Sequence, residues 1–229
     1  MGMLIQIPDV LSSVQVTALR GRLDQANWGD GKITAGSQSA HVKHNLQIGP
    51  ESAEGRELGG IVLRVLEVSE SFVSAALPAR IFPPLFNRYD TGMDFGAHID
   101  NAIRQNPETG MRVRTDLSAT LFLSEPESYD GGELVITDVY GEHRVKPAAG
   151  TLILYPGRSR HYVTPVTRGS RVASFFWIQS MVKDRDQREM LYELDGAVQS
   201  LITRVGENDP ALLTLTGLYH NLVREWGEV

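Results

Sequence analysis

Two histidines, one aspartate and one arginine are the residues of this chain best suited to chemistry. His98 and Asp100 follow a glycine-containing turn, His161 follows a Tyr-Pro-Gly turn, and Arg171 comes ten residues later. Two imidazoles and one carboxylate can bind a metal ion on one face and leave the opposite face open. This ligand type is typical of non-haem Fe(II) oxygenases.

The spacing of the first pair matters because a His-x-Asp triplet is common by chance. If residues 96 to 99 begin a strand, positions 98 and 100 project from the same face and can bind one ion, whereas a helix would separate them. His161 opens a separate β-like segment and is the expected third ligand, although a lone histidine can also cap or pack a strand end. The other histidines lack a carboxylate at this spacing and are expected to be surface or structural residues: His41, His44, His143 and His220.

Arg171 begins the most regular strand pattern in the chain. Ala173, Phe175 and Trp177 share its face, so an arginine in line with them would be a buried cation. A bidentate carboxylate ligand would compensate for that burial. An internal Asp or Glu partner, or a strand end at which the arginine reaches solvent, remains an alternative.

Short β-like runs fill the middle of the chain and are separated by Pro, Gly, Asn and Asp turns. With few helices between them, they favour two facing antiparallel sheets, a jelly roll (double-stranded β-helix), over a parallel α/β sheet. The expected strands cover residues 80–89, 96–99, 117–123, 133–137, 143–146, 151–155, 161–166 and 171–179.

Helices are expected on both sides of this β region, giving a mainly β protein with flanking helices. Ser12 and Gln15 fit a capping box for a first helix, residues 54–68 carry a helical apolar stripe, and residues 30–50 read as loop or irregular strand. A C-terminal helical pair is expected over 184–205 and from Asp209-Pro210 onward. The predicted division is 1–79 as an N-terminal helical support region, 80–182 as the oxygenase core and 183–229 as a helical extension.

Composition narrows the function classes. The formal charge of -6 argues against nucleic-acid binding through phosphate neutralisation, and the absence of cysteine excludes disulfides and thiolate metal sites. No signal peptide or membrane span is evident, so a cytoplasmic protein without membrane or nucleic-acid partners is expected. The apolar C-terminal helices could support a homodimer.

Several motifs together resemble the bacterial PKHD-type hydroxylases, Fe(II)/2-oxoglutarate oxygenases of the prolyl 4-hydroxylase-like group, and in particular the subgroup associated with iron uptake. The similarity extends over nearly the whole chain. It is carried by Phe86-Asn87-Arg88-Tyr89, the run from Gly96 to Arg104, the run from Asp116 to Ser124, the run from Tyr129 to Leu134, Leu154-Tyr155-Pro156 and the run from Trp177 to Val182.

The resemblance implies a role for each site residue. His98, Asp100 and His161 would bind iron, and Arg171 would hold the distal carboxylate of 2-oxoglutarate. Tyr89 would approach this co-substrate, while Leu134 and Trp177 would line the pocket. Related animal enzymes have a tyrosine where Phe122 stands, so one hydrogen bond to 2-oxoglutarate is absent or comes from another group.

The implied reaction is the oxidative decarboxylation of 2-oxoglutarate to succinate and CO2, coupled to hydroxylation of a substrate C–H bond. It would use Fe(II) and dioxygen, with ascorbate as an optional reductant. The substrate would be a peptidyl prolyl or other amino-acid residue, or a small metabolite. Five arginines close to the ligands in sequence suggest a basic rim for an anionic substrate, or else solvated loop charges: Arg104, Arg112, Arg114, Arg158 and Arg160.

Two other functions remain open at this stage. A zinc hydrolase could use the same two histidines and carboxylate, although it leaves Arg171 without a role. A non-catalytic metal or keto-acid sensor could keep the ligands and release no succinate.

Overall fold

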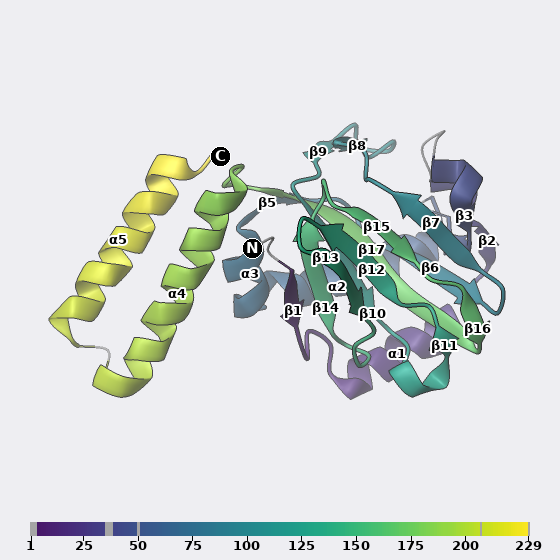
Figure 1. Ribbon diagram of the computed structural model, residues 1–229, viewed down its shortest axis with the longest axis horizontal. Helices are drawn as coiled ribbons and strands as arrows, with labels where there is room; N and C mark the ends of the chain where they lie inside the picture. Colours follow the sequence, from purple (N-terminus) through teal and green to yellow (C-terminus); the bar gives the residue numbers. More distant parts are fainter. Residues whose placement is uncertain (1–3, 35–38, 50, 207, 229) are drawn as a thin grey trace.

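Two antiparallel sheets face each other in the computed structural model, which describes residues 4–34, 39–49, 51–206 and 208–228 (Figure 1). The larger sheet has eight strands: β1 (Ile5–Ile7), β14 (Leu152–Pro156), β10 (Leu117–Phe122), β17 (Ser170–Ser180), β6 (Leu85–Asp90), β4 (Leu46–Ile48) and β2 (Trp28–Asp30) in this order, with β5 (Pro78–Ile81) also paired with β17. The smaller has five: β13 (Gly141–Val145), β12 (Leu134–Asp138), β15 (Arg160–Val163), β7 (Asp94–His98) and β3 (Lys43–His44). The predicted jelly-roll architecture is therefore confirmed.

Two further strand pairs and three 3₁₀ helices close the ends of the barrel. β8 and β9 form a hairpin at the upper end in Figure 1. The bounds of these elements are β8 (Ile103–Gln105), β9 (Arg112–Arg114), β11 (Asp130–Gly131), β16 (Val166–Arg168), η1 (Gly31–Thr34), η2 (Ser39–Val42) and η3 (Pro126–Ser128).

Three helices pack on the outer face of the larger sheet: α1 (Ser13–Leu23), α2 (Ala53–Glu67) and α3 (Glu70–Ala76). The predicted capping box is present in α1, where the Ser12 side chain accepts from the Gln15 backbone and the Gln15 side chain accepts from the Ser12 backbone. The apolar side chains of these helices join alternate residues of β17, including Val172 and Phe176, in one core. The other face of β17 is thereby left to point between the sheets.

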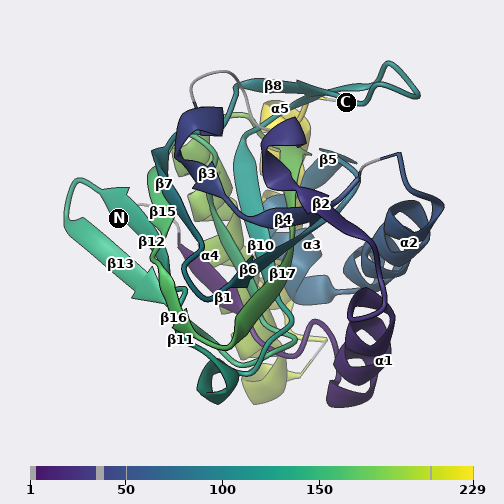
Figure 2. The same ribbon diagram turned by 90° about the vertical axis from the view of Figure 1, so that its right-hand side faces the viewer.

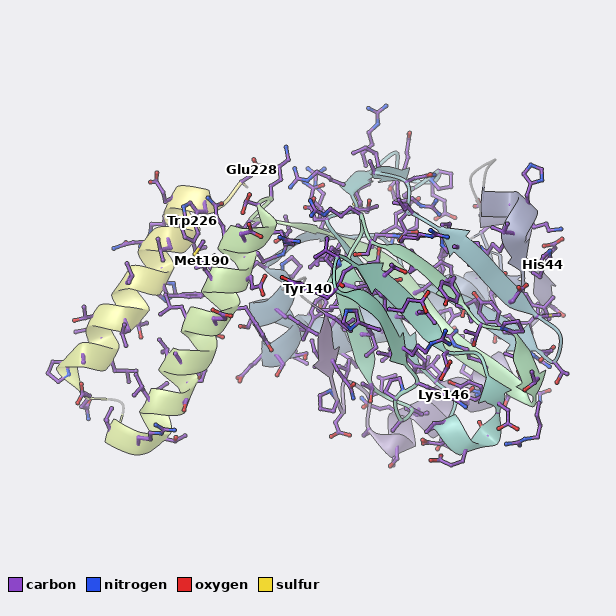
Figure 3. All side chains as sticks on the ribbon, viewed as in Figure 1. His44, Tyr140, Lys146, Met190, Trp226 and Glu228 are labelled. Carbon is purple, nitrogen blue, oxygen red and sulfur yellow. The ribbon has the colours of Figure 1, made fainter. Side chains whose placement is uncertain are left out.

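The C-terminal helices, α4 (Arg185–Val205) and α5 (Pro210–Trp226), form an antiparallel pair that projects away from the barrel (Figure 1). Both begin as the sequence predicts, with Asp184 and Asp209 as N-caps. Figure 3 shows Met190 and Trp226 on this pair and His44 at the opposite end of the molecule. The pair thus lies apart from the inside of the barrel.

Three local expectations need correction. The strand predicted over 80–89 is two strands, because β5 ends at Ile81 and β6 begins at Leu85, beyond Pro83 and Pro84, which have no N–H to donate to a sheet. Residues 30–50, expected as loop or irregular strand, supply β3 and β4 to the two sheets, although 35–38 and 50 lie outside the described residues. The short helix α3 was not predicted. No described helix is long and apolar enough to span a membrane.

Candidate metal and co-substrate site

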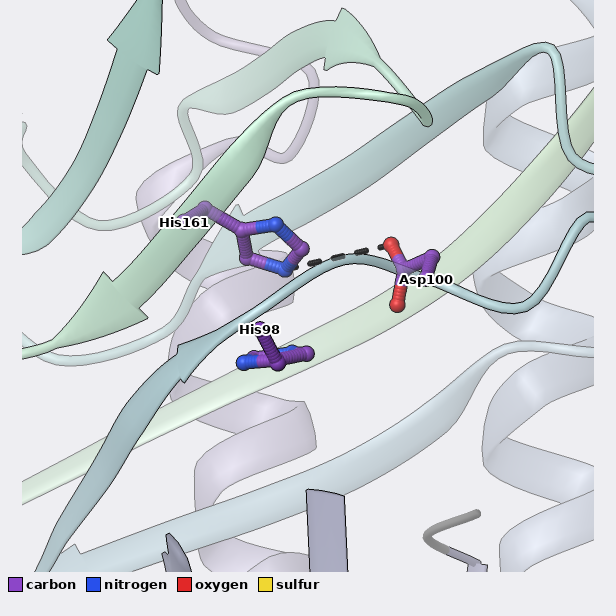
Figure 4. A group of neighbouring side chains, drawn as sticks. All are labelled: His98, Asp100 and His161. Carbon is purple, nitrogen blue, oxygen red and sulfur yellow. Dashed lines mark ion pairs between the residues drawn. The ribbon is translucent and has the colours of Figure 1, made fainter. Parts of the chain in front are cut away.

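His98, Asp100 and His161 come together between the two sheets (Figure 4). His98 ends β7 and lies opposite His161 of β15 in the strand register. One donor atom from each of the three side chains lies within 4.8 Å of the others, and His161 Nε2 is 3.8 Å from Asp100 Oδ2. The expected strand geometry is wrong in one respect, because β7 ends at His98 and Asp100 reaches the group from the loop that follows.

Hydrogen bonds fix the orientation of all three side chains. His98 Nδ1 donates to the Gly96 carbonyl at 2.9 Å, and His161 Nδ1 donates to the Ser159 carbonyl at 3.0 Å. Because a carbonyl can only accept, each ring carries a proton on Nδ1 and has its Nε2 directed to another partner. Ser118 Oγ donates to Asp100 Oδ2 at 2.6 Å. Such outer hydrogen bonds are what orients metal-binding side chains.

Burial keeps His98 in its ligand form. Desolvation first, and then the nearby His161, lowers the pKa of His98 to about 4, while Asp100 opposes the shift. The imidazole of His98 is therefore neutral at ordinary pH, which is the state that binds a metal ion.

Arg171 is almost completely buried beside this group, at 1% exposure. It lies opposite Tyr89 in the register of β17 and β6, and its guanidinium carbon is 5.3 Å from the Tyr89 ring and 4.8 Å from the Phe122 ring. Its Nε and Nη1 atoms have no hydrogen-bond partner among the described residues. A buried guanidinium with donors left over is costly, so this position favours a bound anion.

One cavity contains every residue that the sequence assigns to the site. Its walls include the three candidate ligands, Arg171, Tyr89, Leu134 and Trp177. Burial raises the pKa of Tyr89 to about 12, so its hydroxyl stays protonated. The predicted strand-end or internally paired alternatives for Arg171 do not describe this buried side chain.

Two further cations line the cavity. Sequence reasoning missed Lys43 entirely and placed Arg104 in a rim of five arginines. Lys43 is 3% exposed, although its segment was expected to be irregular, and no motif around it indicates a buried lysine. Arg104 also lines the cavity, with its guanidinium carbon 4.0 Å from the centre of the Trp177 ring.

Of the five arginines expected to form a basic rim or to be solvated loop charges, the other four do not line this cavity. Arg114 pairs with Asp116 at 2.7 Å, and Arg112 is exposed. Arg158 and Arg160 line hollows outside the cavity. Arginines that are close together in sequence end up in different places, because the β8–β9 hairpin reverses the chain and the side chains of a strand alternate between its two faces.

The remaining histidines make no second metal group among the described residues. His44 Nδ1 lies 2.7 Å from Asp94, and His143 Nε2 lies 2.9 Å from Asp138. Each is a pair with a single carboxylate, in keeping with the structural role predicted for them.

Comparison with known proteins places the chain in a family. Residues 84–179 match the 2OG-Fe(II) oxygenase superfamily, and residues 186–228 match the PKHD-type hydroxylase C-terminal domain. A PKHD-type hydroxylase of Caulobacter vibrioides is 56% identical over 227 residues, covering 99% of this chain and 100% of the relative. This chain belongs to the PKHD-type hydroxylases. It is therefore an oxygenase enzyme, of a family that uses Fe(II), 2-oxoglutarate and dioxygen.

Solved structures agree with this PKHD-type hydroxylase in fold. A Pseudomonas putida prolyl-4-hydroxylase is similar with a TM-score of 0.54 and 21% identity, over 79% of this chain and 94% of the other. HygX from Streptomyces hygroscopicus, with nickel, 2-oxoglutarate and hygromycin B bound, is similar with a TM-score of 0.53 and 14% identity. The match covers 78% of this chain and 83% of the other. At these identities the likeness concerns the fold alone.

The residues present fit the family's metal and co-substrate. Two imidazoles and a carboxylate are suitable donors for Fe(II). The unsatisfied donors of Arg171, buried in the same cavity, suit a carboxylate at the far end of a keto acid.

Proposed function

We propose that this enzyme hydroxylates a C–H bond of a peptide or small-molecule substrate and converts 2-oxoglutarate and dioxygen to succinate and CO2. His98, Asp100 and His161 would hold the Fe(II), and Arg171 would bind the distal carboxylate of 2-oxoglutarate. The observation that carries the proposal is the buried Arg171 with unsatisfied donors in the same cavity as the three ligands.

The bound iron and keto acid would supply the oxidising chemistry, and the protein would supply orientation and exclusion of water. Ser118 would hold Asp100 in the position that binds the metal, because its hydroxyl already donates to that carboxylate. The carbonyls of Gly96 and Ser159 would keep both histidine rings in the tautomer with Nε2 available.

The end of the cavity around Arg171 would exclude water from the co-substrate. Tyr89 and Phe122 place aromatic rings beside the guanidinium and are at most 1% exposed. Phe122 offers no hydroxyl, so Tyr89 is the residue we propose to approach 2-oxoglutarate. Leu134 and Trp177 would complete the wall.

Arg171 also separates this function from one of its two alternatives. A zinc hydrolase leaves the buried guanidinium with open donors unexplained. A sensor would use it but would release no succinate, so the two outcomes differ in the experiment below.

The deciding experiment combines anaerobic binding with turnover. Addition of Fe(II) and 2-oxoglutarate should produce a weak visible charge-transfer band. Admission of oxygen with cell extract should release succinate and yield a product that has gained one oxygen atom, detected by mass spectrometry. The His98→Ala variant should lose both signals, whereas Arg112→Gln, at an exposed position outside the cavity, should keep them. Zinc-dependent hydrolysis without dioxygen would refute the proposal, and binding without succinate would indicate the sensor.

Several broader features are also part of the proposal. Ascorbate would act as a reductant, the site of action would be cytoplasmic, and the role would lie in iron uptake. The chain would divide into three regions, with boundaries before residues 80 and 183.

The C-terminal helical pair would support a homodimer, because Leu213 and Leu218 are 76% and 47% exposed on α5. Sedimentation of the wild type and of Leu213→Ser would test this.

A further inference from the structure

We propose that Lys43 and Arg104 form a second anion-binding subsite, which takes a carboxylate of the organic substrate. The subsite lies in the same cavity as the candidate ligands but is separate from the position of Arg171. The inference rests on the proposed function only in assigning its occupant as the hydroxylated substrate. The side-chain arrangement itself stands without that function.

Lys43 lies close to the candidate metal ligands. Its Nζ is 5.3 Å from the centre of the Phe95 ring, and that ring stacks on His98 with 3.8 Å between centroids. The Gln47 side chain accepts a hydrogen bond from Nζ at 2.7 Å and so fixes its position. An anion held by this ammonium would therefore be near the metal ligands.

Arg104 continues the subsite along the cavity. Its guanidinium lies over Trp177, while Lys43 Nζ is 5.8 Å from the ring of Phe175, and the two rings touch edge to face with centroids 5.6 Å apart. The two cations thus lie over neighbouring rings of β17. They come from elements far apart in the sequence, β3 at the edge of the smaller sheet and β8 at the upper end (Figure 2).

Arg171 is too distant to share their anion. Trp177 and Arg171 lie six residues apart on β17, which corresponds to about 20 Å along a strand. Phe175 is four residues from Arg171, or about 13 Å. A carboxylate near Trp177 therefore contacts Arg104 and not Arg171.

The charge of the cavity favours an anionic occupant. Among the described residues in its wall, the cations are Lys43, Arg104 and Arg171, and Asp100 is the one carboxylate. Fe(II) and the 2-oxoglutarate dianion cancel each other, so the loaded cavity keeps one full positive charge from its wall and a second one whenever Lys43 is protonated. The repulsion between Lys43 and Arg104, which contributes to lowering the pKa of Lys43, would be relieved by an anion between them.

A neighbouring acceptor refines the substrate class. Asn87 lines the same cavity and is 8% exposed, and its Oδ1 has no hydrogen-bond partner among the described residues. An N–H of the substrate would satisfy it. The expected substrate therefore carries a carboxylate and an amide N–H, as an N-acylated amino acid or an acidic peptide does.

The test uses two probes that differ in one charge, N-acetylglutamate and N-acetylglutamine, titrated calorimetrically into the full chain with Mn(II) and 2-oxoglutarate. The wild type should bind the carboxylate about tenfold or more tightly, since a hydrogen bond to a charged group is stronger than a neutral one. Lys43→Met and Arg104→Gln should each reduce this ratio severalfold. Arg112→Gln, on the same hairpin, should leave it unchanged. Inorganic phosphate serves as a third probe.

Each contrary result has a definite meaning. A wild-type ratio near one, or no binding of either probe, overturns the subsite, and so does phosphate binding that excludes the organic carboxylate. If Lys43→Met mainly weakens 2-oxoglutarate binding and keeps the ratio, Lys43 serves the co-substrate and the inference is wrong. Failure of 2-oxoglutarate binding in the wild type would instead count against the proposed function, and the probe ratio measured with Mn(II) alone would still decide the subsite.

Discussion

The two ends of the cavity hold their cations in different ways. At the inner end, Arg171 lies between the aromatic rings of Tyr89 and Phe122, with two nitrogen atoms unsatisfied among the described residues. At the outer end, Lys43 is hydrogen-bonded to Gln47 and Arg104 stacks on an indole ring. The inner cation is thus prepared for a ligand of fixed shape, whereas the outer pair presents charge to a more variable one.

This difference also separates cofactor chemistry from substrate choice. The inner cation and one candidate metal ligand stand on long or central strands, β17 and β15, whose register fixes their positions. The outer cations stand on β3 and β8, which have two and three residues. These two short strands supply none of the candidate metal ligands, so their residues, and with them the specificity, can vary while the ligand set stays the same.

The largest expected effect is at the metal ligands. Asp100→Ala should lower succinate release by more than about a thousandfold, because loss of an outer partner alone costs about 10- to 100-fold. Metal content after dialysis and turnover should fall together. Asp116→Ala, which removes a carboxylate outside the cavity, is the matched control for charge. Full activity of Asp100→Ala would remove it from the metal site.

Next in size is the effect of the inner cation. Arg171→Met should weaken 2-oxoglutarate binding by about 100-fold or more, since loss of one partner of a buried charge pair costs about 2–5 kcal/mol. The same change should raise the melting temperature of the protein without ligands, because it removes a buried guanidinium with open donors. Calorimetry and thermal unfolding measure the two effects. Arg168 is an exposed residue paired with Asp130, so Arg168→Met should change neither the affinity for 2-oxoglutarate nor the melting temperature.

The success of sequence reasoning follows the same division of the cavity. The Arg171 face of β17 could be predicted because an eleven-residue strand alternates its side chains without interruption. Asp100 was expected on a strand and lies in a loop, yet the two-residue spacing still brought it beside His98. The near absence of helices between the predicted strands was sufficient to favour a jelly roll over a parallel α/β sheet.

The outer end could not be predicted, for physical reasons. Lys43 lies in a two-residue strand whose partner is chosen by tertiary pairing with Phe95 rather than by local pattern. The arginines near the ligands diverge because Arg114 is drawn into an ion pair with Asp116. Proximity in sequence therefore overstated the basic rim and missed the cation that lies deepest in the outer wall.

A smaller effect is expected from the hydroxyl that positions Asp100. Ser118→Ala removes a donor 2.6 Å from the carboxylate and should lower metal affinity about tenfold. Competition with a metal chelator measures it, and 2-oxoglutarate binding at saturating metal should change little. Ser174→Ala is a matched buried serine that donates to the Leu85 carbonyl instead. Equal losses in both variants would indicate general destabilisation.

The last expected effect concerns stability rather than binding, namely the stability that Lys43 costs the protein without ligands. Burial first, and then Arg104, lowers its pKa to about 7 from 10.5, while Asp100 and Asp30 oppose the shift. The folded state then binds fewer protons than the unfolded state between these values, so the cost is complete below pH 7 and disappears as the pH approaches 10.5. Lys43→Met should therefore raise the free energy of unfolding by up to about 5 kcal/mol at pH 6 and by much less at pH 10. Urea unfolding at both pH values measures this, with the exposed Lys32→Met as control. A gain that is the same at both pH values would mean that Lys43 is not a strained cation, and the outer end would then differ from the inner end in packing alone.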